Sequence, residues 1–160
     1  MTFYFVLCDN HISFYYSTFS WFELPNLNKK RYQGTAIWVP SYDFLFVGGS
    51  NEEGQAENSV ELLRFFGYVP VGKWNFITHM LDPVEWPLVA NITRRIFVLD
   101  AFSSPPSLQM LFLNNIPNRQ WTYINHNNPF EDKFKAWSMT AKNGRLYLSG
   151  LSHFSCSFSK

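Results

Sequence analysis

The sequence has few charged residues and no long apolar segment. Charged residues make up 16% of its 160 residues, and the formal net charge is +1. The longest block of like charge is Lys29-Lys30-Arg31, so no basic face of the kind that nucleic acids require is predicted. No segment approaches the roughly 18 to 20 apolar residues of a membrane helix. We therefore expect no nucleic-acid partner and no membrane partner.

Cysteine and histidine are also scarce. Cys8 and Cys156 lie far apart and not at the spacing of metal ligands. One disulfide is an open alternative, but a reduced, cytoplasmic protein is the favoured interpretation. The four histidines, with no HxH, HExxH or paired His/Cys spacing, are His11, His79, His126 and His153. The sequence therefore predicts neither a metal site nor a cofactor.

Motifs of nucleophilic catalysis and phosphate binding are missing as well. The patterns GxSxG, GxxxxGK[ST] and GxGxxG do not occur. Two acidic pairs, Glu52-Glu53 and Glu131-Asp132, could suggest acid–base chemistry, but both fall in polar segments and are interpreted as solvating charges. We predict that the protein is not an enzyme.

Aromatic residues, by contrast, are abundant. They make up 19% of the chain, with 17 Phe, 8 Tyr and 6 Trp, and hydrophobic residues make up 46%. Aromatic and β-branched side chains favour strands, and no stretch combines helical periodicity with caps. The predicted fold class is all-β.

Tandem repetition is the strongest pattern in the chain. Apolar runs end at Cys8-Asp9, Gly48-Gly49, Asp100-Ala101 and Ser149-Gly150, and short alternating segments open at Trp21, Trp74 and Trp121. Each tryptophan is followed after 28, 27 or 29 residues by the second residue of the next pair. The intervals between tryptophans are 53 and 47 residues. A period of about 50 residues fits a four-stranded propeller blade.

The repeat divides into strands. Inner strands are expected at 34–39, 88–92 and 136–141, next strands at 44–47, 96–99 and 145–148, and third strands at 12–16, 59–63 and 108–113. The tryptophans open the fourth strands. Asn143-Gly144 predicts a type I′ hairpin turn. The resulting units are approximately 1–24, 25–78, 79–125 and 126–160.

Gly48 and Gly49 have a physical explanation in this scheme. Where inner strands converge, the chain turns sharply beside neighbouring backbone, and glycine permits positive φ without a Cβ atom to collide. A hairpin bulge in an unrelated sandwich would explain the pair alone, but the recurrent spacing favours a blade.

Residues 21–74 resemble a kelch repeat. The elements that match the family pattern, in order, are Trp21, Leu24-Pro25, Arg31, the strand at 34–39, the apolar run ending at Gly48-Gly49, Ser59-Val60-Glu61 and Trp74. The flanking units lack Gly-Gly and Ser-Val-Glu and are similar through spacing alone.

The resemblance implies blades of a β-propeller, usually of about six, that serves as a protein-recognition platform. In this family the propeller is often the substrate receptor of a ubiquitin ligase whose BTB domain binds a cullin, or it engages actin. No BTB-like helical region precedes the repeats, so ligase recruitment is not implied. About three and a half units make an incomplete ring. A fragment of a longer protein, a homo-oligomer completing the ring and an open arc are the three interpretations.

The resemblance also supplies candidate binding residues. In kelch receptors the arginine before the inner strand lines the pocket and pairs with acidic ligand groups, and Arg31 matches that position. The same alignment places Trp86 and Lys133 near the corresponding sites. Ser50 and Asn51 follow the glycine pair, on a face whose loops are expected to carry recognition residues. A solvated turn residue is the alternative interpretation of Arg31.

The tryptophans are predicted to be structural. The fixed interval of Trp21, Trp74 and Trp121 before each inner strand favours packing between blades over a sugar-stacking ladder. Trp38 and Trp137 fall in inner strands and are expected in the core or lining the channel.

We therefore expect a non-catalytic protein–protein interaction module of kelch type, as a substrate-recognition or actin-associated fragment. An enzyme on a kelch-like propeller, acting on a sugar or related small molecule, is the alternative class. A vestigial structural fragment is a third.

Overall fold

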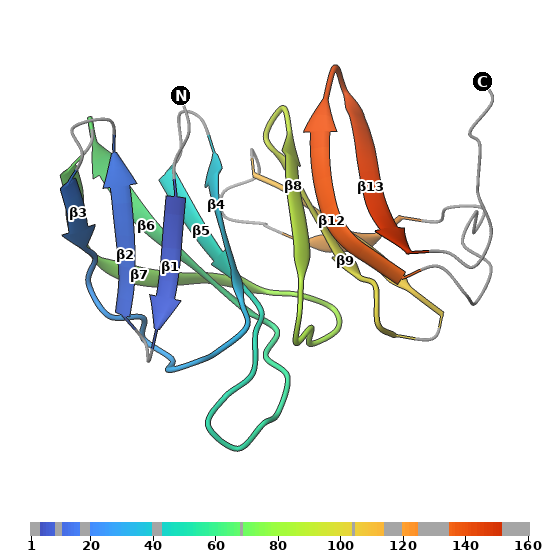
Figure 1. Ribbon diagram of the computed structural model, residues 1–160, viewed down its shortest axis with the longest axis horizontal. Coiled ribbons are helices and arrows are strands. Elements are labelled where there is room, and N and C mark those ends of the chain that lie inside the picture. Colours follow the sequence, from blue (N-terminus) through green and yellow to red (C-terminus); the bar gives the residue numbers. More distant parts are fainter. Residues whose placement is uncertain are drawn as a thin grey trace. The chain divides into compact units, whose positions relative to one another are not determined.

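The computed structural model describes residues 4–8, 11–16, 20–39, 43–67, 69–103, 105–113, 120–124 and 135–151. Every regular element among these residues is a strand, so this part of the chain is all-β, as predicted. The strands are β1 (Tyr4–Cys8), β2 (His11–Tyr16), β3 (Ser20–Glu23), β4 (Thr35–Val39), β5 (Asp43–Val47), β6 (Ser59–Phe66), β7 (Val69–His79), β8 (Leu88–Ile92), β9 (Arg95–Asp100), β10 (Ser107–Phe112), β11 (Trp121–Tyr123), β12 (Lys135–Lys142) and β13 (Arg145–Leu151), shown in Figure 1. The described residues contain no helix with the length and hydropathy needed to cross a bilayer.

The strands form antiparallel sheets in which neighbours in sequence are neighbours in space. β1–β3 make a three-stranded sheet, β4–β7 and β8–β11 make four-stranded sheets, and β12 pairs with β13. Each sheet is therefore a meander, in which short connections suffice to join consecutive strands. By backbone contacts the chain divides into two compact units, Met1–Pro87 and Leu88–Lys160.

The predicted inner, next and third strands all coincide with observed ones, with ends that differ by at most a few residues. The fourth strands differ from the prediction. Trp121 opens β11, but Trp21 is the second residue of β3, and β7 begins at Val69, before Trp74. β7 starts early because Phe66 pairs with Val69 and extends the β6–β7 hairpin beyond the expected strand end.

Two hairpin turns share the same backbone geometry but not the same residues. Asn143 and Gly144 have φ angles of 52° and 73°, which confirms the predicted type I′ turn. Thr93 and Arg94, between β8 and β9, have φ angles of 43° and 64°. A β-branched residue at positive φ is strained, so the second turn is held by the paired strands on either side.

The core of the first unit lies against the β4–β7 sheet. Its fully buried residues are Leu24, Leu27, Phe44, Phe46, Leu63 and Trp74. Phe44 and Phe46 alternate along β5 with Leu45 and Val47, which are equally buried, so β5 is covered on both faces. Packing on both faces explains why β5 is a continuous apolar run.

The second unit has its own, smaller core. Leu99, Ala101 and Ala136 are buried together, and the half-buried residues packed against them are Leu88, Leu108, Met139 and Leu148. This core joins the β8–β11 sheet to the β12–β13 hairpin.

Candidate functional site

The turn at the end of β5 is built on the predicted glycine pair. Gly48 and Gly49 have φ angles of 61° and 99°. A Cβ atom on Gly48 would lie 2.6 Å from the carbonyl oxygen of Val84, and one on Gly49 would lie 2.4 Å from that of Tyr32. Positive φ and close backbone approach, the two reasons given for glycine at these positions, are both confirmed.

Backbone hydrogen bonds fasten three segments around this turn. The amide of Gly49 donates to the Val84 carbonyl (2.8 Å), and the amide of Val84 donates to the Glu57 carbonyl (3.2 Å). Glu57 donates in turn to the Gly49 carbonyl (2.7 Å). The segment after β7 is thereby tied to both ends of the loop between β5 and β6, which brings Trp86 beside that loop.

Tyr32 and Ser50 pair on the other side of the turn. Each donates its amide to the carbonyl of the other, both over 2.8 Å. The Ser50 hydroxyl lies 3.3 Å from Oε1 of Gln33, and its side chain is buried. Ser50, predicted to bind a partner, thus anchors the loop through its backbone, and its binding role stays a prediction.

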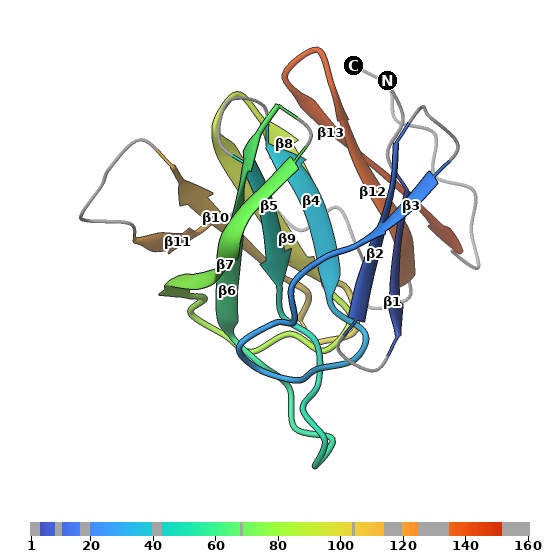
Figure 2. The ribbon, with the colours of Figure 1, turned by 90° about the vertical axis from the view of Figure 1, so that its left-hand side faces the viewer.

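Asn51 organises the loop that follows. Its Oδ1 accepts hydrogen bonds from the amides of Glu53 (3.0 Å) and Gln55 (2.9 Å), and its own amide donates to the Gln55 carbonyl (2.9 Å). Residues 52–56 are exposed and project beyond the strand ends in Figure 1 and Figure 2. The loop is thus ordered by the hydrogen bonds of Asn51, although residues 52–56 face solvent.

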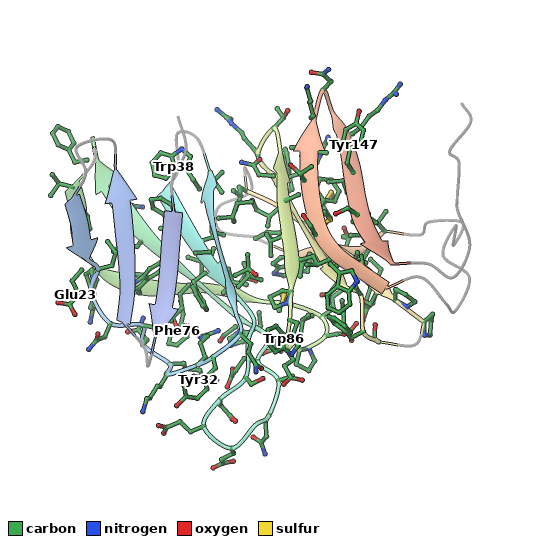
Figure 3. The ribbon with its side chains drawn as sticks, in the orientation of Figure 1. Glu23, Tyr32, Trp38, Phe76, Trp86 and Tyr147 are labelled. Atoms are coloured by element: carbon green, nitrogen blue, oxygen red, sulfur yellow. The ribbon has the colours of Figure 1, made fainter. Side chains whose placement is uncertain are left out.

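These segments form one surface, which we call the loop face: Tyr32, Asn51, residues 52–56 and Trp86. Trp86 is 51% exposed, and Tyr32 is half-buried. Figure 3 shows both side chains at the end of the unit from which the loop projects, whereas Trp38 lies at the other end. The loop face combines aromatic rings, which are enriched in protein interfaces, with carboxylates and amides, which suit the polar rim of an interface.

Arg31 is fully buried and does not face a ligand as expected. Its guanidinium donates to the carbonyl oxygens of Gly48 (3.2 Å) and Ser59 (3.0 Å) and to Oε1 of Glu61 (2.7 Å). It also lies 5.7 Å from the centre of the Phe46 ring. A group enclosed in this way contacts only its own chain here, so the binding role of Arg31 stays a prediction and the contacts observed are structural ones.

The electrostatics of Arg31 follow from this enclosure. Burial lowers the pKa of Arg31 below its ordinary value, and the carboxylates of Glu61 and Glu57 oppose that shift. Arginine nevertheless remains charged at any pH that the protein meets. Arg31 therefore keeps its positive charge beside the Glu61 carboxylate.

Glu61 also accepts hydrogen bonds from the segment that precedes β4. Its Oε2 accepts from the amide and the side-chain Nδ2 of Asn28, each over 2.8 Å, and its Oε1 accepts from the Lys29 amide (3.3 Å). Asn28 donates further to the Trp74 carbonyl (2.7 Å). The Glu of Ser-Val-Glu thus has a role that the sequence pattern alone did not reveal.

The corresponding residue of the second four-stranded sheet is Gln109. Glu61 is the third residue of β6 and Gln109 the third residue of β10, and both are fully buried. A buried amide needs hydrogen-bond partners but no countercharge, whereas a buried carboxylate requires a cation. The charged residue therefore occurs in the sheet that has Arg31.

Two further ion pairs border the loop face. Lys29 Nζ lies 2.9 Å from Glu57 Oε2, and Lys30 pairs with Glu52. Both lysines are exposed, so each pair contributes at most about 1 kcal/mol to stability.

The predicted structural tryptophans occupy different environments. Trp74 is buried in the core, and its Nε1 donates to the Pro25 carbonyl (2.8 Å). Trp121 is also buried, but its Nε1 has no hydrogen-bond partner in the described part of the chain. For Trp21 the structure describes the backbone, in β3, and not the side chain.

Trp38 packs at the edge of the first core, in tilted contact with Phe44 at 4.7 Å between ring centres. Trp137 was expected in the core or lining the channel; it is 58% exposed, which excludes the core position and leaves the channel-lining position a prediction. It lies at a register shift between Ala136 and Ser138 and directly follows the buried Ala136, so its side chain faces the opposite side of β12.

Several residues named in the sequence analysis lie outside the described part of the chain. They are Lys133, Cys156, His126, His153 and the pair Glu131-Asp132. Among the described residues, no group of three His, Cys, Asp or Glu side chains could hold a metal ion.

Sequence reasoning missed Tyr32 as a member of the loop face. Its position directly after Arg31 was the available signal, because a buried residue in an extended segment is commonly followed by one that faces the opposite way.

Comparison with known proteins identifies no relative: no family model matches the chain, and no curated protein is similar to it at a significant level.

Proposed function

We propose that the protein is a non-catalytic interaction module of kelch type, whose sheets are propeller blades and whose loop face recognises a protein partner in the cytoplasm. The single observation that carries this proposal is the exposed Trp86 ring beside a loop that is already ordered. Trp86 is 51% exposed, and the segment that holds it is hydrogen-bonded to Gly49 and Glu57.

Order in the free protein favours binding because little conformational entropy remains to be lost. Tryptophan and tyrosine are enriched among residues that dominate interface energies, and the loop face has one of each, Trp86 and Tyr32. The exposed carboxylate of Glu53 is placed to select a partner by charge. Arg31 supports this surface from beneath, since its guanidinium binds the Gly48 and Ser59 carbonyls at the two ends of the loop and is itself held by Glu61.

The proposal is tested by affinity capture with the wild type and Trp86→Ala, followed by titration of the captured protein. Trp137→Ala is the matched control, because Trp137 is similarly exposed but belongs to the other unit. We expect Trp86→Ala to weaken the complex by about tenfold or more, as loss of an aromatic hot spot does. The control should bind like the wild type, and both variants should keep the wild-type melting temperature. Equal affinity of the wild type and Trp86→Ala would contradict the proposal.

A further inference from the structure

The hairpin between β6 and β7 presents apolar side chains to solvent. Phe66 is 84% exposed, Val69 65% and Val71 52%. Single exposed apolar residues are ordinary, but these three are adjacent. Phe66 pairs with Val69, and Arg64 pairs with Val71. Since residues that pair across an antiparallel ladder point to the same side, these four residues share one face, which we call the hairpin tip.

The hairpin tip is fixed in this orientation by its opposite face. Phe65, which points the other way, packs against the core, with its ring centre 5.0 Å from that of Phe44 and 6.0 Å from that of Trp38. Turning the tip inward would expose Phe65 instead. The exposure of Phe66, Val69 and Val71 is therefore part of the fold.

The hairpin tip carries a positive charge at Arg64, and Lys73 follows two residues after Val71. No acidic residue occurs between Glu61 and Asp82, and the exposed Arg64 and Lys73 lie within that interval. Neither forms an ion pair with a described residue. A ligand of this surface is expected to combine apolar groups with negative charge.

Addition of a strand from another chain is the less suitable way to cover this region. β7 is an edge strand of its sheet, but Pro70 has no amide to donate. The register shifts between Leu62 and Arg64, and Lys73 adds charge to the edge. Proline, lysine and bulges are the features that prevent edge-to-edge pairing. Recognition here depends on the projecting side chains of the hairpin tip.

We propose that the hairpin tip binds an anionic membrane surface. Phe66 and Val69, at the end of the hairpin, enter the boundary between headgroups and acyl chains, and Arg64 and Lys73 pair with acidic headgroups. The expectation of no membrane partner came from the lack of a spanning segment, which a peripheral contact does not require, and this proposal revises it. The tip lies at the end of β6 opposite the loop face, so it does not depend on the proposed function.

Vesicle co-sedimentation of the full chain tests the proposal. The probes are neutral phosphatidylcholine vesicles and vesicles that contain about one-third phosphatidylserine. We expect the wild type to sediment with the anionic vesicles and not with the neutral ones. High salt should release the bound protein. Phe66→Ser should lower partitioning about tenfold, because it removes the largest inserted side chain.

Phe76→Ser is the matched control, since Phe76 is also on β7 and nearly half exposed but lies away from the hairpin tip. It should bind anionic vesicles like the wild type, and both variants should keep the wild-type melting temperature. Absence of vesicle binding, equal binding to neutral vesicles, or an equal loss in Phe76→Ser would overturn the proposal. So would a wild type that ignores vesicles but captures an acidic protein that Phe66→Ser does not.

Discussion

Arg31 and Glu61 form an ion pair inside the first unit, with Nη2 of Arg31 2.7 Å from Oε1 of Glu61 and neither side chain exposed to solvent. The two residues lie in the segment before β4 and in β6. Further bonds from Arg31 to the Gly48 and Ser59 carbonyls join the two ends of the projecting loop. The pair therefore links the core of the sheet to the surface that we propose binds a partner.

Breaking this pair from one side should be costly. Arg31→Met leaves the Glu61 carboxylate buried without a cation, and we expect the free energy of unfolding to fall by about 3 to 5 kcal/mol. Glu61→Gln should destabilise by a comparable amount. The double variant has a neutral amide at position 61, as the other sheet has at the corresponding Gln109. Its loss of unfolding free energy should be smaller than the sum of the two single losses. Urea denaturation of the four proteins measures this, and additive losses would contradict the ion-pair interpretation.

Two glycines of one loop should respond differently to alanine. Gly49→Ala combines a φ of 99° with a Cβ atom 2.4 Å from the Tyr32 carbonyl, so we expect a loss of about 3 kcal/mol or more. Gly54 has a φ of 75° but nothing within 4 Å of its Cβ position. Gly54→Ala should cost only about 1 kcal/mol, the strain of the backbone alone. Similar losses in thermal unfolding of the two variants would be incompatible with the close approach at Gly49.

The two buried tryptophans allow a similar comparison. Trp74→Phe removes ring volume and the hydrogen bond to the Pro25 carbonyl, whereas Trp121→Phe removes an N–H that has no described partner. Deleting an unsatisfied buried donor offsets part of the packing loss. Trp121→Phe should therefore lower the free energy of unfolding less than Trp74→Phe does, by about 1 kcal/mol or more. Chemical denaturation of both variants gives the comparison. A larger loss at Trp121 would refute it.

Substitutions in the turn between β8 and β9 should remove its backbone strain. Replacing Thr93-Arg94 by Asn-Gly supplies residues that tolerate positive φ at both positions, as Asn143-Gly144 already does between β12 and β13. We expect the double substitution to stabilise the protein by about 1 to 2 kcal/mol. Calorimetry should show a higher melting temperature, and an unchanged or lower one would mean that the native side chains contribute contacts that outweigh the strain.

Much of the fold could be predicted because it depends on local patterns. Apolar runs of strand length bounded by turn residues located β4, β5, β8 and β9, and Asn143-Gly144 identified a turn by the φ angles that it permits. Gly48-Gly49 was assigned to a close backbone approach for the same reason. These features depend on neighbours in the sequence.

Side-chain direction was harder to predict because it depends on distant residues. Arg31 was expected at a binding surface because it matches the arginine that lines the pocket in kelch receptors. Its buried partner Glu61 lies thirty residues away and could not be inferred from neighbouring residues. Trp137 was expected in the core or lining the channel; its 58% exposure rules out the core, and the register shift at which it lies is announced by no residue pattern. The loop face likewise needed the hydrogen bonds of Val84 to show that Trp86 lies beside the loop.

Photo-crosslinking from the loop face tests the proposed function most directly. A photoreactive phenylalanine analogue in place of Trp86 should form a covalent adduct with one protein partner on irradiation, whereas the same analogue in place of Trp137 should not. The adduct should disappear when unlabelled wild-type protein competes. Failure to crosslink from position 86, or the same adducts from both positions, would contradict recognition through this surface.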